Sequence, residues 1–156
     1  MEIRPFQDED ADGLAQIFFA SVRTGGRLAY SAEQVAAWAP EAPDPARYKA
    51  RAADGRILLV AVDDDGFPLA YGDLESDGHI DHLYCRPNAI GQGVASALYD
   101  RLEAVARERG ISRLYVEASE LARPLFERKG FSADERRDLE VRGVAIHNYA
   151  MSKRLA

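Results

Sequence analysis

The apolar residues of this chain recur at two spacings, which predict strands alternating with helices. A strand over residues 2–5 precedes apolar residues at helical spacing, which predict a helix over about residues 11–22. Ser31 and Gln34 form a capping signal for a second helix that ends near Trp38. The elements predicted next are a helical turn at 47–52, strands at 57–62, 68–75 and 79–85, a helix at 94–109, a strand at 113–119, a short helix ending on Gly130, and a closing pair of strands at 133–141 and 143–151.

The order of these elements predicts a mixed sheet with helices on both faces. Residues 57–62 are apolar without a break, as in a strand that is covered on both sides. Turn sequences at 64–66 and 76–78 connect the middle strands as an antiparallel meander. The helix at 94–109 then crosses over to a parallel strand. We therefore expect an α/β protein (an α+β mixed sheet) with a central, mostly antiparallel sheet, built as one domain over residues 1–156.

Composition narrows the class of function. A net charge of −6 and a pI of about 5.1 oppose the basic face that nucleic-acid binding needs, so no nucleic acid is expected as a partner. Cys85 is the single cysteine, which fits a reducing compartment. No signal-like segment or long apolar run is present, so we expect a cytoplasmic protein with no membrane partner and no metal site. A homodimer stays open as the alternative to a monomer.

A glycine-rich loop separates the strand that ends at Cys85 from the next helix. Unpaired N–H groups and the helix dipole make such a helix start favourable for anions, and glycine lets an anion approach the backbone closely. The loop has no Gly-Lys-Ser/Thr, and it has Ser96 where a dinucleotide fingerprint needs a third glycine. A phosphate-holding loop of another kind is therefore predicted.

Two motifs resemble the signatures of the GNAT N-acetyltransferase family. The loop Ile90-Gly91-Gln92-Gly93-Val94-Ala95 resembles motif A, Gln/Arg-x-x-Gly-x-Gly/Ala, with Ile90 in place of the opening Gln/Arg. A second signature, Asn/Ser-x-x-Ala-x-x-x-Tyr/Phe-x-x-x-Gly-Phe, is similar to the segment with Ser119, Ala122, Phe126, Gly130 and Phe131. The two motifs come in the family's order, and the resemblance is strongest over residues 79–131.

The resemblance implies the GNAT fold and an N-acetyltransferase. Such an enzyme passes the acetyl group of acetyl-CoA to a primary amine of a small molecule or peptide, by direct attack in a ternary complex. The residues implied to hold acetyl-CoA are Leu83, Tyr84, Cys85, Ile90, Gly91, Gln92, Gly93, Val94, Ala95, Ser96, Ser119 and Phe126. The alternative from another class is a non-catalytic acyl-CoA-binding sensor or interaction module on the same fold.

The catalytic groups are expected on the strand at 79–85. Alternation places His79, Asp81, Leu83 and Cys85 on one face, and the resemblance implies a base at Asp81 or at His79. We expect Asp81 to be the base, directly or through water, with a pKa raised by a partly apolar cleft. Phe126 stands where the family often has a Tyr that acts as the general acid. The proton donor therefore stays open between Tyr84, Tyr115 and a water held by Ser119; alternatively, the thiolate leaves unprotonated.

Ser119 is also expected to cap the short helix that follows it. The acceptor pocket is expected to contain Tyr30, Trp38, Asp73, Glu75 and His147, because aromatic and acidic side chains suit a cationic amine. Tyr30, Gln34 and Trp38 would share a helical face if the second helix began that early. The sequence leaves open the identity of the amine and whether the chain is catalytically active.

Overall fold

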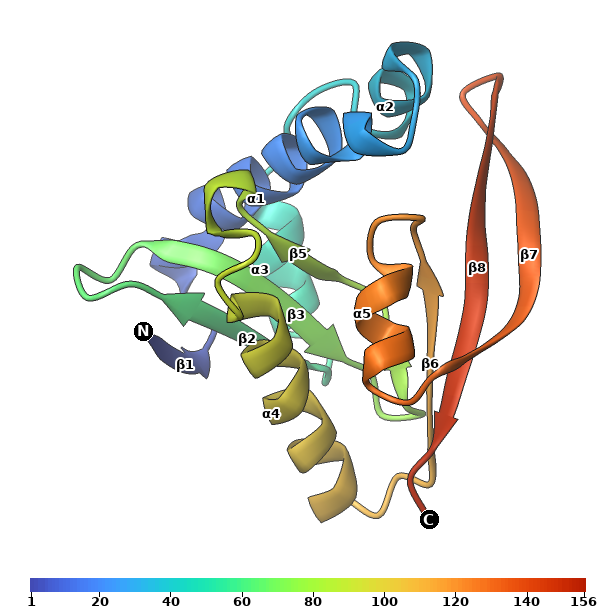
Figure 1. Cartoon of the computed structure of the whole chain (residues 1–156). Coiled ribbons are helices and arrows are strands. Elements are labelled where there is room, and N and C mark those ends of the chain that lie inside the picture. The colour runs from blue at the N-terminus through green and yellow to red at the C-terminus, as the bar shows by residue number, and fades with distance from the viewer.

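The computed structural model describes residues 1–156 as two four-stranded sheets that lie close together at one end and separate toward the other (Figure 1). The place where they separate, at Asp81 and His82, is called the fork below. The first sheet has the order β1-β2-β3-β5 and the second the order β4-β6-β8-β7. The strands are β1 Glu2–Pro5, β2 Ile57–Val62, β3 Pro68–Leu74, β4 His79–Ile80, β5 Leu83–Cys85, β6 Arg113–Ala118, β7 Ser132–Val141 and β8 Val144–Arg154. The helices are α1 Ala11–Arg23, α2 Ala32–Trp38, α3 Ala46–Ala52, α4 Val94–Glu108 and α5 Arg123–Arg128. None of these helices is both long enough and apolar enough to cross a membrane.

The predicted helices and strands are present, with one correction at residues 79–85. These residues form two short strands in different sheets rather than one strand. β4 pairs in parallel with β6, and β5 pairs antiparallel with β3. The chain therefore leaves one sheet for the other at Asp81 and His82, and side-chain alternation cannot be counted through that point.

A buried carboxylate holds this break in place. Asp73 is fully buried, and its Oδ1 accepts hydrogen bonds from the N–H groups of Asp81, at 2.8 Å, and His82, at 2.9 Å. Its Oδ2 accepts hydrogen bonds from Arg51, at 2.6 Å, and Arg56, at 2.9 Å. Because a buried charge is tolerated only when it is paired and hydrogen-bonded, this network supports the carboxylate at the fork.

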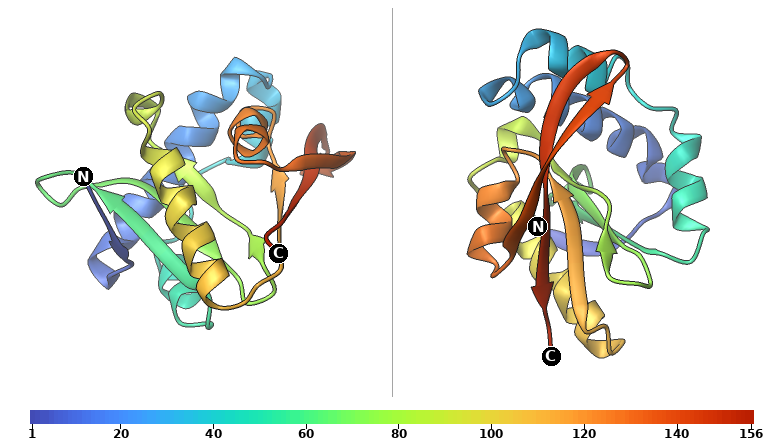
Figure 2. Two further views of the ribbon diagram at one scale, coloured as in Figure 1. Left: turned by 60° about the horizontal axis from the view of Figure 1, so that its bottom comes forward. Right: turned by 90° about the vertical axis from the view of Figure 1, so that its right-hand side faces the viewer.

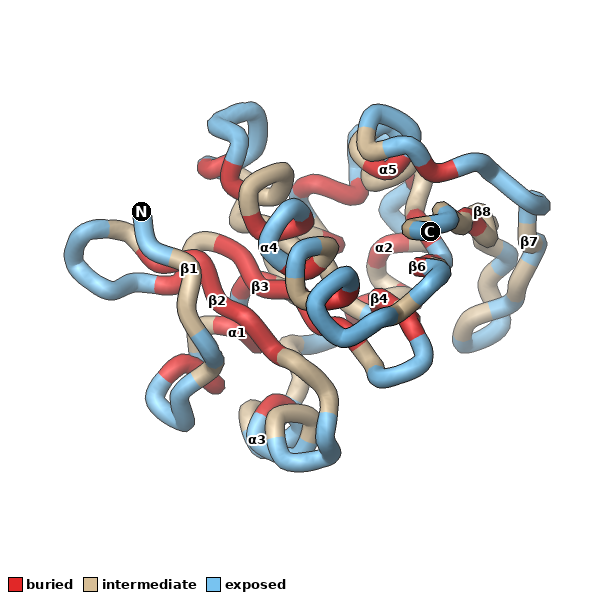
Figure 3. The backbone as a smooth tube through the Cα atoms, turned by 90° about the horizontal axis from the view of Figure 1, so that it is seen from below, coloured by how far each residue is buried: buried red, intermediate tan, exposed pale blue.

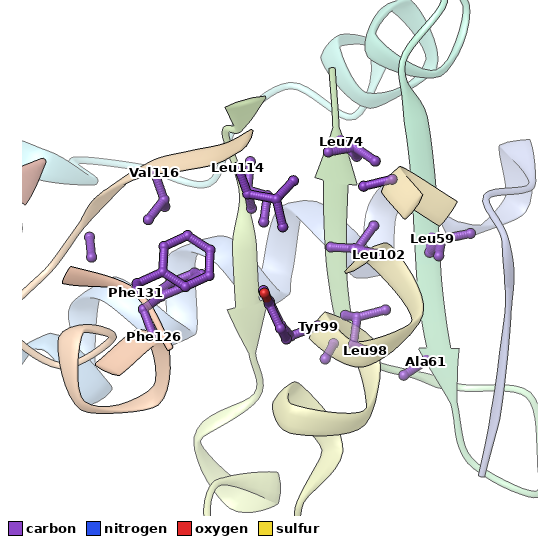
Figure 4. Close-up of a cluster of buried hydrophobic side chains, with 14 of the residues drawn as sticks. Leu59, Ala61, Leu74, Leu98, Tyr99, Leu102, Leu114, Val116, Phe126 and Phe131 are labelled. Atoms are coloured by element: carbon purple, nitrogen blue, oxygen red, sulfur yellow. The ribbon is translucent and has the colours of Figure 1, made fainter. Parts of the chain in front are cut away.

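The core lies on both faces of the first sheet, as the apolar run at 57–62 predicted. Leu58, Val60 and Val62 pack in the cluster that contains α1 and α3 residues, whereas Leu59 and Ala61 pack in the cluster that contains α4 residues. Figure 2 shows α1 and α4 on opposite sides of this sheet, and Figure 4 shows the side chains between α4, α5 and the strands. Burying each large side chain stabilises the fold by roughly 1.5–3 kcal/mol.

The β7–β8 hairpin is the least buried part of the structure. Most of β7 is exposed, as the tube in Figure 3 shows. The hairpin turns at Arg142 and Gly143, as predicted, and both residues have left-handed backbone angles, with φ of 49° and 81°. The Gln34 side chain donates a hydrogen bond to the carbonyl oxygen of Ala145, at 3.0 Å, so α2 is attached to this end of β8.

Candidate functional site

A cavity of about 650 Å³ extends along the fork between the two sheets. One end is formed by the glycine loop and the first turn of α4. The middle is lined by the ends of β5 and β6 and by α5. The far end is lined mostly by apolar side chains of α1, of α2 and the segment before it, and of the β7–β8 hairpin, namely Val22, Tyr30, Trp38, Leu139, Val141 and Ile146, together with Ser21, His147 and Asn148.

The loop is open toward this cavity. Gly91 and Gly93 line the cavity with φ of 83° and 81°, and a Cβ built on either would meet no atom within 4 Å. Their conformation, rather than crowding, therefore favours glycine. Gly93 is the N-cap of α4 and offers no side chain to the first-turn N–H groups, so these groups are available to an anion.

Most of the residues predicted for the donor lie around the cavity. Its lining includes Leu83, Tyr84, Cys85, Ile90, Gly91, Gly93, Val94, Ala95, Ser96, Ser119 and Phe126. Gln92 is the exception, because it is exposed and its side chain donates a hydrogen bond to the carbonyl oxygen of Asn88.

Side chains in the middle of the cavity are mainly structural. Phe126 is buried and packs edge-on against Tyr99 and Phe131. The Ser119 hydroxyl accepts a hydrogen bond from the N–H of Ala122 at 3.1 Å, which fixes the turn before α5. The N-cap of α5 itself is Ala122, so Ser119 closes the preceding turn rather than capping the helix as expected. Burial raises the pKa of the Cys85 thiol, so Cys85 is a neutral packing group.

Two carboxylates lie where the sheets separate. The parallel pairing of β4 with β6 ends at Ile80 opposite Val116, and the next residues are Asp81 and Glu117. Both line the cavity. Sequence reasoning missed Glu117. Glu117 lies on β6 two residues before Ser119, which directly follows the strand. Strand alternation would direct both side chains to the same side, and this is the signal that could have identified Glu117.

Asp81 is held by arginines. Its Oδ2 lies 2.6 Å from Arg51 and 3.4 Å from Arg56. Burial raises the pKa of Asp81, but the hydrogen bond from Arg51 and the nearby positive charges outweigh burial, so the pKa is lowered from 3.8. The expected upward shift was therefore wrong, because no local pattern in the sequence indicates that Arg51 reaches this carboxylate.

His79 does not line the cavity but contacts a residue that does. Its Nε2 lies 2.8 Å from Glu117 Oε1, and its Nδ1 lies 2.8 Å from Glu75 Oε1. Its ring stacks on Tyr115 with the ring centres 4.7 Å apart. Burial alone lowers the pKa of His79, but the hydrogen bonds to the two carboxylates outweigh burial and raise the pKa above 6.5.

His82, three residues further on, behaves in the opposite way. It is partly buried, its Nδ1 lies 3.0 Å from the Tyr71 hydroxyl, and Arg51 is nearby. Burial and the charge of Arg51 lower the pKa of His82 to about 4, so its ring is neutral at pH 7.

Two of the predicted acceptor residues lie outside the cavity. Asp73 is fully buried beneath the fork, where its carboxylate is fully engaged with arginines and N–H groups. Glu75 does not line the cavity and lies 2.8 Å from His79 Nδ1. Neither has a surface facing the cavity, because the fork directs the end of β3 toward Arg51 and Arg56 instead.

The other predicted acceptor residues come together at the far end. Tyr30 precedes α2 rather than lying on a helical face with Trp38. The two rings nevertheless pack edge to face, with their centres 5.8 Å apart. The Tyr30 hydroxyl donates a hydrogen bond to the carbonyl oxygen of His147 and accepts one from the N–H of Glu120. His147 Nε2 lies 2.6 Å from Glu120 Oε2.

Two further features concern what this site can bind. The Oδ1 atom of Asn148 is buried and has no hydrogen-bond partner, so a ligand N–H group at this end would find an acceptor. No group of three or more His, Cys, Asp or Glu side chains is arranged to hold a metal ion.

Comparisons with known proteins agree on one family. The sequence profile of the acetyltransferase (GNAT) domain matches residues 27–153. A curated relative, the uncharacterized N-acetyltransferase YafP of Escherichia coli (strain K12), is 31% identical over 151 residues, which cover 97% of this chain and 94% of YafP.

Solved structures give the same result. A GCN5-related N-acetyltransferase from Rhodopseudomonas palustris, also titled a class-II aminotransferase, is 37% identical with a TM-score of 0.89, covering 99% of this chain and 95% of that chain. The structure of yncA, a putative acetyltransferase from Salmonella typhimurium solved with its cofactor acetyl-CoA, is 20% identical with a TM-score of 0.77, covering 100% and 94% of the two chains. This second similarity shows the shared fold.

Proposed function

Because the chain belongs to the GNAT family of acetyltransferases, we propose that it transfers the acetyl group of acetyl-CoA to a primary amine with an apolar body. One observation carries the proposal. A single cavity connects an open glycine loop at a helix N-terminus to an apolar pocket, with two carboxylates between them.

Acetyl-CoA would occupy the loop end and the fork. Its pyrophosphate would accept hydrogen bonds from the free N–H groups at the start of α4, where the helix dipole also favours negative charge. The pantetheine would lie along β5, because β5 is an edge strand whose only partner is β3. The unpaired backbone groups of such an edge can pair with an extended ligand.

The amine would enter from the far end. Aromatic and aliphatic side chains dominate there, so they suit the apolar part of a small molecule or of a peptide. Asp81, kept ionised by Arg51, would attract the cationic form of the amine toward the fork.

The reaction proceeds by direct attack in a ternary complex. The ammonium group loses a proton, and the nitrogen lone pair forms a bond to the thioester carbonyl carbon. The C–S bond then breaks, its electron pair stays on sulfur, and the nitrogen loses a second proton. Of the proton donors that the sequence left open, Tyr84 lines the cavity and burial raises its pKa, so it stays protonated. Tyr115 instead donates a hydrogen bond to Asp77.

Phe126 favours one competing function, a non-catalytic acyl-CoA sensor, since this residue carries no hydroxyl to protonate the thiolate. The two functions are separated by following the release of free CoA over a panel of primary amines. An enzyme releases CoA with at least one amine, whereas a sensor binds acetyl-CoA without release.

The donor site is tested with Gly93→Val. A β-branched residue is strained at φ of 81° and would crowd the phosphates, so acetyl-CoA affinity should fall at least about tenfold, the loss expected for one hydrogen bond to a charged group. Gly66→Val is the matched control, because Gly66 has φ of 85°, equally open surroundings and no place in the cavity. Calorimetric titration with acetyl-CoA measures both. Equal affinities in the two variants would rule out the loop as the donor site.

A further inference from the structure

We propose that Glu117 removes the proton from the acceptor amine, and that His79 and Glu75 carry this proton from the cavity to the surface. The inference rests on the proposed acetyl transfer and assigns its proton path. Glu117, His79 and Glu75 are called the histidine relay below.

The relay is a continuous line of hydrogen bonds that begins in the cavity. Glu117 lines the cavity, with a third of its side chain exposed. Its Oε1 lies 2.8 Å from His79 Nε2, whereas its Oε2 has no partner and remains available to a substrate. His79 Nδ1 lies 2.8 Å from Glu75 Oε1, and the Glu75 side chain is 36% exposed. One end of the line therefore meets the substrate cavity, and the other meets solvent.

Glu117 suits this role better than Asp81 because of its partner. Asp81 is paired with Arg51, which never releases a proton and keeps the carboxylate a weak base. Glu117 is paired with a histidine, whose charge can change in the neutral pH range. A proton that reaches Glu117 thus has a hydrogen-bonded acceptor beside it, whereas the side chains bonded to the Asp81 carboxylate are arginines, which cannot accept a proton.

The working form of the relay is fixed by imidazole chemistry. A neutral ring has one N–H and one acceptor nitrogen. With Nδ1–H donating to Glu75, Nε2 accepts from Glu117 once Glu117 is protonated. The titratable and charged groups that face His79 are Glu75, Asp77 and Asp81 from its own segment, and Tyr115 and Glu117 from β6, with Arg113 beyond the Tyr115 ring. These carboxylates favour the charged ring and raise the pKa of His79. The neutral ring, which is the form that accepts a proton from Glu117, therefore accumulates only at a pH above 6.5.

The proton balance closes. One proton of R–NH₃⁺ passes to Glu117 Oε2, and the amine forms the C–N bond while the CoA thiolate leaves. Rotation of the Glu117 carboxyl group then places the protonated oxygen beside His79, Nε2 takes this proton, and the Nδ1 proton goes through Glu75 to water. The second nitrogen proton neutralises the thiolate. The sum is R–NH₃⁺ plus acetyl-CoA giving the acetamide, CoA–SH and one proton released to solvent.

The first test replaces Glu117 and measures kcat and acetyl-CoA affinity. Glu117→Gln keeps the shape and the hydrogen bond to His79 but cannot take a proton. We expect kcat to fall about 10²-fold or more with acetyl-CoA affinity unchanged, since a general base contributes ~10²–10⁴. Glu135→Gln, an exposed change on β7 outside the cavity, is the matched control and should leave kcat unchanged. Near-normal turnover in Glu117→Gln would overturn the proposal.

The second test measures the pH dependence of kcat/KM and the pKa of His79. Glu75→Gln keeps an acceptor for Nδ1–H and removes one negative charge, so the pKa of His79 falls. The acid limb of the kcat/KM profile should then move to lower pH, a shift that a merely structural role would not produce. NMR titration of His79 should show the same downward shift without any amine present. An unmoved His79 pKa overturns the relay. A wild-type protein that binds acetyl-CoA but acetylates no amine overturns the proposed function instead.

Discussion

Two clusters of carboxylates flank the fork, and they differ in the partner that holds them. The arginine cluster consists of Asp73 and Asp81 with Arg51 and Arg56. The histidine relay consists of Glu75, His79 and Glu117, and Arg56 also lies 3.9 Å from Glu75. Arginine stays charged at every accessible pH, so the partners of Asp73 and Asp81 keep their positive charge, whereas the histidine between Glu75 and Glu117 can change its charge near neutrality.

Burial separates Asp73 from the other three carboxylates. Asp73 has no exposed surface and holds two backbone N–H groups, so it fixes where the chain leaves one sheet for the other. Asp81 and the two glutamates of the relay are each about one-third exposed. The fork is thus held by Asp73 and its arginines, whereas the proposed proton path uses the exposed glutamates on either side of His79.

The largest expected effect is on stability, from Asp73→Ala. This change removes the fully buried partner of two arginines and leaves two N–H groups unpaired, which should cost about 3–5 kcal/mol of unfolding free energy. Urea denaturation measures the change. Asp54→Ala is the control, because Asp54 also pairs with Arg56 but at the surface, and it should leave the denaturation midpoint almost unmoved. If the two variants lose the same stability, Asp73 does not hold the fork.

The next effect separates the two carboxylates in catalysis. Asp81→Asn removes a negative charge, so we expect a higher KM for a cationic amine and a kcat reduced less than about tenfold. The acid limb should remain and move to lower pH, because Asp81 is one of the carboxylates that raise the pKa of His79. The sequence-based hypothesis, in which Asp81 is the base, instead expects a kcat loss of about 10² and the loss of that limb. Steady-state kinetics across pH, run beside Glu117→Gln, decides between the two carboxylates.

The smallest effect is a pH dependence of stability with opposite slopes from two histidines. His79 has a raised pKa, so its contribution is complete below pH 6.5 and is lost as pH rises through its folded pKa. His82 has a pKa lowered to about 4, so the unfolded chain takes up the proton first and stability is lost as pH falls from 6.5 toward 4.

Urea midpoints measured across pH check both slopes, each at most about 1.4 kcal/mol per pH unit. His79→Asn should flatten the profile above pH 6.5 and leave the lower slope. His82→Asn should do the reverse. A single variant that flattens both slopes would contradict the opposite pKa shifts of the two histidines.

Much of the fold and of the donor side of the site could be predicted from the sequence because its signals are local. The left-handed glycines Gly91 and Gly93, the capping box at Ser31 and Gln34, and the apolar run at 57–62 depend on neighbours a few residues away. The same holds for the family motifs, which lie between residues 79 and 131 and were found in order.

The break at Asp81 and His82 could not be predicted, because the carboxylate that holds it belongs to Asp73 on another strand. The pKa of Asp81 depends on Arg51, which lies 30 residues away in the sequence but 2.6 Å away in space. For the same reason Glu75, expected at the acceptor, was found bonded to His79 outside the cavity lining.

The sequence by itself therefore determined the elements, the loop that faces the donor and the family. Only the tertiary structure decided which carboxylate is held by arginine and which by histidine. The physical reason is the separation in sequence between the residues whose contacts decide each property. Backbone conformation and helix capping are set by contacts between near neighbours, whereas the charge state of a carboxylate at the fork is set by side chains that meet only when the two sheets come together.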